Sequence, residues 1–150
     1  MKRKQLLTPE NVVLSLEADT KNGVIAGLLD LLVSNGEVGD REEALRALQE
    51  REEKMSTGME KGIAIPHGKC SCVDRLVTAV GLSKGGIDFD ALDKKPSHIF
   101  IMTLSPKSRS GPHIQFLAEV SRLLKKEENR QALLSAESRE EVVRVFQGKS

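Results

Sequence analysis

The first third of this chain shows apolar positions at helical spacing, which predicts two amphipathic helices. The first follows Thr20, a residue type that caps helix N-termini, and the run Ser34-Asn35-Gly36 ends it. Asp40, with Glu43 three residues later, opens the second helix in the manner of a capping box, and we expect that helix to end near residues 51–53. The predicted apolar faces consist of Val24, Ile25, Leu28, Leu29 and Leu32 in the first helix and Ala44, Leu45, Ala47 and Leu48 in the second.

Four other segments have the composition of β-strands. Residues 12–16 are expected to be a first extended segment, and residues 63–65 an apolar, β-prone run that Pro66 ends. Residues 76–82 form the next predicted strand, ended by Lys84-Gly85-Gly86. Residues 98–104 are almost continuously apolar, which is typical of a central strand buried on both faces.

The last third of the chain predicts three more helices. Pro112 is expected at the first position of one, where its missing N–H is tolerated, and a shorter helix is expected over 129–134. Ser138 with Glu141 opens the last one. Because helices and strands intermix along the chain, we expect an α/β fold with a mixed β-sheet covered by helices in one domain. Residues 1–8 are interpreted as an N-terminal arm and residues 9–150 as the domain.

The composition argues against binding of nucleic acids or membranes. The 150 residues are 39% hydrophobic with a net charge of +1, so there is no global electrostatic case for binding nucleic acid or a membrane surface. The four Phe, without Trp or Tyr, offer few stacking platforms for single-stranded nucleic acid. No apolar run approaches the roughly 20 residues of a membrane span, and we expect a cytoplasmic protein.

Two cysteines, Cys70 and Cys72, stand one residue apart. A bridge across so short a separation would be strained, so we expect reduced thiols. Together with His67 they form an H-x-x-C-x-C string, but three such crowded ligands rarely complete a tetrahedral zinc site. Neither a metal nor another cofactor is therefore expected.

Candidate chemistry centres on His67, which follows the apolar run and Pro66 and precedes Gly68. An imidazole held at the end of a strand could act as a nucleophile or acid–base group, or could be incidental to a capped strand. His113 lies in the first turn of a predicted helix, where free N–H groups favour an anion, although a solvent-facing histidine would have the same spacing. Arg51 could clamp phosphate oxygens or could simply be a solvated charge at a helix end. His98 is interpreted as a structural strand residue.

These residues resemble a family. Thr57-Gly58, followed by the stretch 62–67 (Gly-Ile-Ala-Ile-Pro-His), resembles the signature of mannitol/fructose-type enzyme IIA domains of the bacterial phosphoenolpyruvate-dependent phosphotransferase system. Arg51-Glu52, the stretch 86–93 (Gly-Ile-Asp-Phe-Asp-Ala-Leu-Asp) and His113 follow in the expected order. The resemblance covers nearly the whole chain and implies a mixed sheet between helices.

The resemblance also implies a role for each matching position. His67 would accept a phosphoryl group, His113 would stabilise it and Arg51 would supply positive charge. The donor would be the histidine phosphocarrier protein HPr or its nitrogen-branch equivalent. Residues 66–69, 74–75 and 87–93 look more like the nitrogen-regulatory branch, so we expect a phosphoryl carrier with a regulatory output and target proteins. The alternative is a sugar-uptake subunit that passes the group to a cysteine of an enzyme IIB domain; a non-phosphorylated binding module or a His/Cys metal site fits the residues less well.

Overall fold

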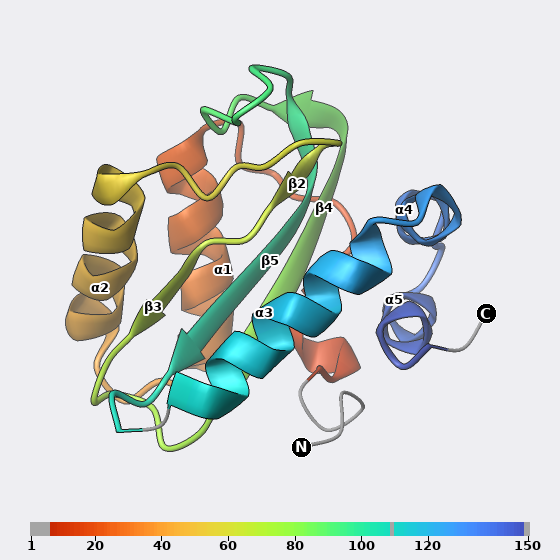
Figure 1. The fold of residues 1–150 in the computed structure, drawn as a ribbon. Coiled ribbons are helices and arrows are strands. Elements are labelled where there is room, and N and C mark those ends of the chain that lie inside the picture. The colour runs from red at the N-terminus through yellow and green to blue at the C-terminus, as the bar shows by residue number, and fades with distance from the viewer. Residues whose placement is uncertain (1–6, 109, 149–150) are drawn as a thin grey trace.

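The chain folds into three layers, with a twisted β-sheet between two groups of helices (Figure 1). A computed structural model describes residues 7–108 and 110–148. The helices α1 and α2 lie on one face of the sheet, and α3, α4 and α5 lie on the other. This arrangement confirms the predicted single-domain α/β fold with a mixed sheet. Six of the eight residues in the expected N-terminal arm lie outside the described residues, whereas Leu7 is buried in the core.

The sheet contains parallel and antiparallel strands. Its strands are β1 (Val12–Val13), β2 (Ile63–Ala64), β3 (His67–Lys69), β4 (Val77–Ile87) and β5 (Ser97–Ser105). β5 is the strand with which β2, β3 and β4 all pair. The order is β1-β4-β5-β2, and β3 also pairs with β5, further along the same edge as β2. β4 and β5 are antiparallel, and the other pairings are parallel. As predicted, β5 is buried on both faces.

Side-chain caps set the starts of the helices as the sequence predicts. Thr20 accepts a hydrogen bond from the backbone N–H of Gly23, and Asp40 accepts one from that of Glu43. Ser138 does the same for Glu141. The helices are α1 (Lys21–Ser34), α2 (Arg41–Lys54), α3 (Ser110–Leu124), α4 (Glu127–Leu134) and α5 (Arg139–Phe146), preceded by a short 3-10 helix (Pro9–Asn11).

The alternating faces of β5 explain why the layers form two hydrophobic cores. Ile99 and Ile101 pack with α3, α4 and α5, while Phe100, Met102 and Leu104 pack with α1 and α2. Successive side chains of a strand point to opposite faces, so a continuous apolar run supplies both cores at once.

Several predicted boundaries are wrong. β4 continues through Gly85 and Gly86 to Ile87, because a shift of its register with β5 after Leu82 accommodates them. The glycines therefore mark an irregularity in the strand rather than its end. α3 begins at Ser110, two residues before Pro112, which stays within the first turn where no N–H is needed.

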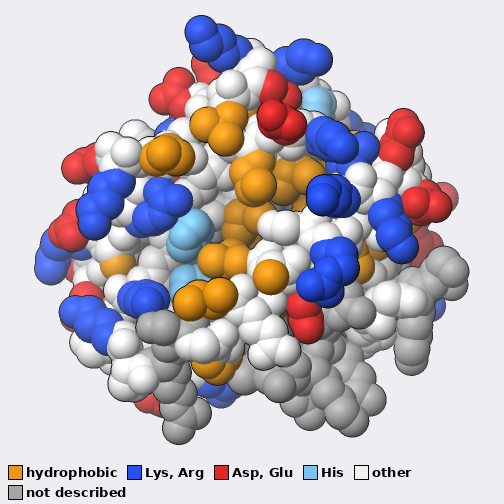
Figure 2. Space-filling model, viewed as in Figure 1, with side chains coloured by type: hydrophobic (Ala, Val, Ile, Leu, Met, Phe, Trp, Pro, Cys, Tyr) orange, Lys and Arg blue, Asp and Glu red, His pale blue; other side chains and the backbone are white. Residues whose placement is uncertain are grey.

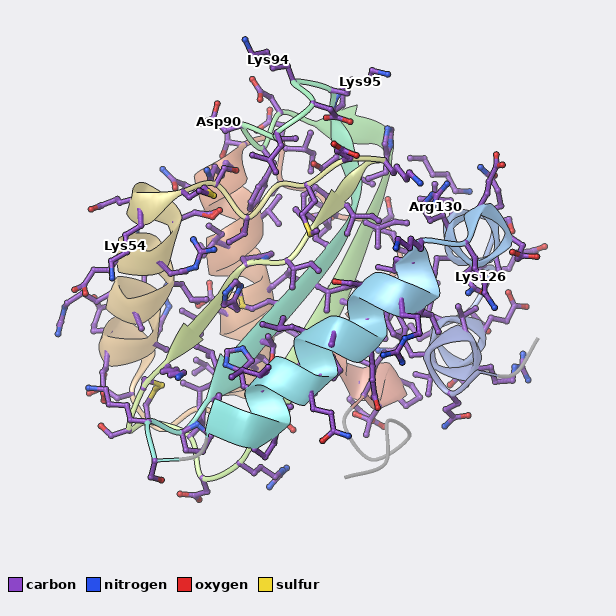
Figure 3. All side chains as sticks on the ribbon, in the orientation of Figure 1. Lys54, Asp90, Lys94, Lys95, Lys126 and Arg130 are labelled. Carbon is purple, nitrogen blue, oxygen red and sulfur yellow. A yellow bond between two sulfur atoms is a disulfide. The ribbon has the colours of Figure 1, made fainter. Side chains whose placement is uncertain are left out.

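The cysteine prediction is also wrong. Cys70 and Cys72 form a disulfide directly after β3 (Figure 3). Their Cα atoms are 5.3 Å apart, within the range that a disulfide can span. The short separation in sequence was expected to strain a bridge, but the turn at residues 71–72 places the two Cα atoms at a distance that a disulfide can span.

Candidate active site

His67 is the first residue of β3 and is half-buried. The strand was expected to end at Pro66, but Pro66 only separates β2 from β3, and its carbonyl oxygen accepts a hydrogen bond from the N–H of Thr103. The Nδ1 atom of His67 lies 2.7 Å from the carbonyl oxygen of Ile65. A carbonyl oxygen only accepts, so Nδ1 carries the proton and donates it. The lone pair of a neutral His67 is therefore on Nε2.

His113 meets His67 across the gap between α3 and β3. The ring centroids are 5.5 Å apart and the rings are nearly perpendicular. His113 is only 3% exposed, and its Nε2 atom is buried without a hydrogen-bond partner among the described residues. An unpaired buried polar atom is unfavourable, so this nitrogen is suited to bind a group that enters the gap.

Burial favours the neutral form of both imidazoles. Burial is the largest cause that lowers the pKa of His67; the hydrogen bond to Ile65 opposes it, and the charge of Arg51 adds to it. Burial, with smaller effects from His67 and Lys69, lowers the pKa of His113 to about 4. Near neutral pH the site thus presents two uncharged rings, with the lone pair of His67 on Nε2.

Arg51 lies in the last turn of α2 and donates from Nη1 to the carbonyl oxygen of Met55 at 2.7 Å. Its charge reaches His67, because it lowers the pKa of that ring. Of the three predicted site residues, His67 and His113 are therefore in ring contact, and Arg51 acts on His67 through its charge. His98, interpreted from the sequence as a structural residue, lies on β5 with its Nδ1 atom 2.9 Å from the carbonyl oxygen of Ser83.

A chain of hydrogen bonds that the sequence did not indicate leads to His67. The Glu52 side chain, 7% exposed, accepts from both the N–H and the hydroxyl of Thr57 at 2.6 Å. The carbonyl oxygen of Thr57 accepts from the N–H of Ile65, whose own carbonyl oxygen accepts from His67. Lys21 lies 3.7 Å from the Glu52 carboxylate and compensates its buried charge. We call Glu52, Thr57 and Ile65 the positioning relay.

Gly58 lets this relay lie close to the neighbouring loop. A Cβ atom at Gly58 would come within 2.9 Å of the Cα atom of Ala91 and 3.0 Å of the carbonyl oxygen of Phe89. Gly68, beside His67, has a similar function, since its Cβ would lie 3.2 Å from the backbone of Ala47 on α2. The glycines of the sequence motif thus permit the close backbone contacts that hold the site.

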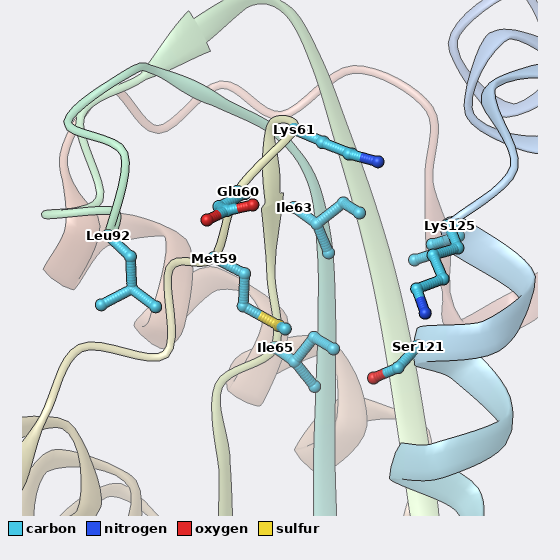
Figure 4. Close-up of a pocket in the computed structure, with 9 residues that line it drawn as sticks. Met59, Glu60, Lys61, Ile63, Ile65, Leu92, Ser121 and Lys125 are labelled. Atoms are coloured by element: carbon cyan, nitrogen blue, oxygen red, sulfur yellow. The ribbon is translucent and has the colours of Figure 1, made fainter.

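An apolar groove of about 350 Å³ lies between the loop before β2 and the end of α3. Figure 4 shows Leu92 and Met59 on one side and Ser121 and Lys125 on the other. In Figure 2, histidine side chains border this apolar surface, and Lys and Arg side chains surround much of it. The apolar lining consists of Met59, Ile63, Ile65, Leu92 and Leu124. Ile65 belongs to both the groove and the positioning relay, so the two are continuous.

The described residues offer little for a metal or a membrane. Across residues 7–108 and 110–148, no three His, Cys, Asp or Glu side chains are grouped as a metal ion would require. The sulfur atoms of the H-x-x-C-x-C string are bonded to each other. Over the same residues, no helix has the length and apolar character needed to span a bilayer.

Comparisons with known proteins identify the family of this chain. Residues 5–149 match the family described as phosphoenolpyruvate-dependent sugar phosphotransferase system, EIIA 2. A fructose-specific EIIA component of Haloferax volcanii is 44% identical over 93% of this chain and 92% of its own length. A fructose-specific EIIABC component of Bacillus subtilis is 36% identical over 97% of this chain, which spans 23% of that longer protein.

A solved structure of a related protein has the same fold. The crystal structure of nitrogen regulatory protein IIA-Ntr from Neisseria meningitidis superposes with a TM-score of 0.85, at 27% identity over 95% of this chain and 97% of that one. The higher identity to fructose-specific relatives favours the sugar-uptake alternative over the predicted nitrogen-regulatory branch. The chain therefore belongs to the type 2 EIIA family of the phosphoenolpyruvate-dependent phosphotransferase system and is a phosphotransfer component that works through a phosphohistidine.

Proposed function

We propose that this protein is a fructose-type EIIA subunit that accepts a phosphoryl group from phospho-HPr on Nε2 of His67 and passes it to a cysteine of an EIIB domain. The observation that carries the proposal is the hydrogen bond from Nδ1 to Ile65, which leaves the lone pair on Nε2. The 44% and 36% identities to fructose-specific relatives support the sugar class. These partners are cytoplasmic, so we place the protein in the cytoplasm.

In each of the two phosphoryl transfers, one bond to phosphorus forms and one breaks, and no cofactor takes part. The Nε2 lone pair of His67 attacks phosphorus, and the phosphorus–nitrogen bond of the donor breaks with its electron pair returning to the donor ring. Because Nδ1 keeps its proton, the phosphorylated ring of His67 gains positive charge. The carbonyl oxygen of Ile65, 2.7 Å away, stabilises that charge. In the second step a cysteine thiolate of the EIIB domain attacks phosphorus, and the electron pair returns to Nε2.

His113 and Arg51 offset the charge of the phosphoryl oxygens. Such transfers depend on positioning and electrostatics, since charge spreads over the equatorial oxygens. The unpaired Nε2 of His113 can donate a hydrogen bond to one of those oxygens in its Nε2–H tautomer. Its pKa of about 4 keeps it neutral near pH 7, so its role is that of a hydrogen-bond donor and not a cation. Arg51 supplies the positive charge.

The apolar groove is the docking surface for the protein partners. It borders the histidines (Figure 2) and exposes Leu92, 62% accessible, and Met59, 37% accessible. Lys61, Lys125 and Glu60 also line it, so cations outnumber carboxylates two to one, and it fits a partner that inserts apolar side chains flanked mainly by carboxylates. Both the donor and the EIIB domain must bring a reactive atom to His67, and a shared groove allows each to bind in turn.

The test is stepwise transfer in a purified system. The protein is incubated with phosphoenolpyruvate, enzyme I and HPr, and one acid-labile phosphoryl group on His67 is sought by mass spectrometry. His67→Ala should remove the label and leave the fold intact, whereas His113→Ala should keep the label and slow its formation. Adding a fructose-type EIIB domain should then discharge the phosphoprotein. Labelling that persists in His67→Ala would overturn the proposal, and discharge only to regulatory targets would favour the nitrogen branch.

A further inference from the structure

The disulfide lies next to the proposed phosphorylation site. Cys70 follows β3, whose first residue is His67, and Cys72 ends the bonded turn. Cys70 is fully buried in the core beneath α1 and α2, whereas Cys72 is half-buried at its edge. Cys72 is therefore the more accessible of the two residues, and attack by a thiolate from solution is expected there.

Hydrogen bonds tie the turn to α2 and to β5. Ser71 donates from both its N–H and its hydroxyl to Glu43 on α2, at 3.0 and 2.7 Å. The N–H of Cys70 donates to the carbonyl oxygen of Ser105, and the carbonyl oxygen of Cys72 accepts from the N–H of Gly39, just before α2. The turn thus joins β3 to the helix whose last turn carries Arg51 and Glu52.

We propose that Cys70 and Cys72 are a reversible dithiol–disulfide couple that controls phosphoryl transfer at His67, with faster transfer in the oxidised form. The inference rests on the proposed function. A thiolate of a low-molecular-weight thiol or a thiol–disulfide exchange protein attacks the sulfur of Cys72, and Cys70 leaves as a thiolate and takes a proton. A second thiol then attacks the mixed disulfide, which releases Cys72 and forms the external disulfide. Two electrons and two protons enter the protein.

Reduction has a structural consequence because Cys70 is fully buried among core residues. Bonded sulfurs are about 2 Å apart, and separate thiols need roughly 3.5–4 Å. Cys70 is enclosed, so the Cys72 end of the turn shifts and loosens the contacts to Gly39 and Glu43. α2 packs directly on β3, where a Cβ at Gly68 would lie 3.2 Å from Ala47. A shift of α2 therefore moves the site.

In the proposed cytoplasmic location, thiols can reduce the Cys70–Cys72 disulfide reversibly. Disulfides of cytoplasmic proteins are mostly transient and respond to the thiol pool, whereas structural ones belong to oxidising compartments. A half-buried sulfur at the edge of the core is reachable by such thiols. The redox state of the cell would then adjust the rate at which this subunit is charged.

The experiment measures both the couple and its effect. The protein is equilibrated in dithiothreitol buffers of graded redox potential, and alkylation with mass spectrometry counts free thiols. Oxidised and reduced samples, freed of dithiothreitol, are then mixed with purified phospho-HPr in a rapid-quench device. A misplacement of about 1 Å slows such steps by roughly 100-fold, and the turn is only a few residues from His67, so we expect about tenfold slower phosphorylation after reduction. The Cys70→Ser/Cys72→Ser double variant should show one rate after either treatment.

Each result has one meaning. A single transition from no free thiol to two, with a slower reduced form, supports the proposal. Two free thiols in every buffer, or equal rates in the two forms, would overturn it, while phosphorylation in either form would leave the proposed function standing. A redox effect of the same size in the double variant would also overturn it. Absence of label on His67 in both forms would instead refute the proposed function and with it the control of transfer.

Discussion

Replacing Thr57 by valine removes one hydroxyl from the positioning relay with little change of shape. In the structure this buried hydroxyl donates to the Glu52 carboxylate at 2.6 Å, alongside the N–H of the same residue. A hydrogen bond to a charged group contributes about 1.5–3 kcal/mol, so Thr57→Val should lower the free energy of unfolding by about 2 kcal/mol. Thr57→Ser is the matched control, because it keeps the hydroxyl and loses only a methyl group, worth about 0.8 kcal/mol.

Two measurements test this prediction. Urea unfolding of the two variants should separate them by about 1 kcal/mol, with valine the less stable. Rapid-quench phosphorylation by phospho-HPr should be about tenfold slower in Thr57→Val than in Thr57→Ser, since the relay through Ile65 orients the His67 ring and small displacements are costly in such steps. Equal stability and equal rates would refute the reasoning that Glu52 and Thr57 position His67.

Three further predictions concern pH, backbone contact and docking. The pKa of His113 is about 4 when folded and about 6.5 when unfolded, so the unfolded state binds more protons between those values, and this ring alone should lower stability by about 2 kcal/mol from pH 7 to pH 5. Urea unfolding of His113→Gln should lose this part of the pH dependence and keep the part from His67, whose pKa burial also lowers. Gly58→Ala should destabilise by about 1–3 kcal/mol in thermal unfolding, because of the contact with the next loop, while Gly85→Ala, which meets nothing within 4 Å, should be near neutral. Leu92→Asp should raise KM for phospho-HPr several-fold with unchanged stability, since this side chain is 62% exposed, and an unchanged KM would remove the groove from the docking surface.

The caps and the central strand could be predicted from the sequence because their signals are local. Thr20, Asp40 and Ser138 each bond an N–H three residues ahead, so the pattern and the contact coincide. The apolar run of β5 likewise identifies a strand buried on both faces. Where the outcome depended on a distant partner, prediction failed: β4 passes through Gly85 and Gly86 only because β5 accommodates the irregularity.

The sequence singled out His67, His113 and Arg51 as candidates but could not indicate how they are arranged. They stand on three different elements, and the packing of α3 and β3 places the His113 ring against His67, while the charge of Arg51 on α2 acts on His67. The relay was missed because Glu52 and Thr57 have side chains common on surfaces, and nothing local indicates that this carboxylate is buried. The disulfide was missed for a related reason, since its feasibility depends on the Cα–Cα distance that the turn after β3 sets.

The central claim is that the orientation of His67 makes Nε2 the phosphoryl acceptor. ³¹P and ¹⁵N NMR of the phosphorylated protein, labelled with ¹⁵N-histidine, tests it most directly, because phosphorus–nitrogen coupling identifies the modified ring nitrogen. We expect phosphorus on Nε2 of His67, with Nδ1 still protonated and bonded to the Ile65 carbonyl oxygen. Phosphorus on Nδ1, or on His113, would contradict it.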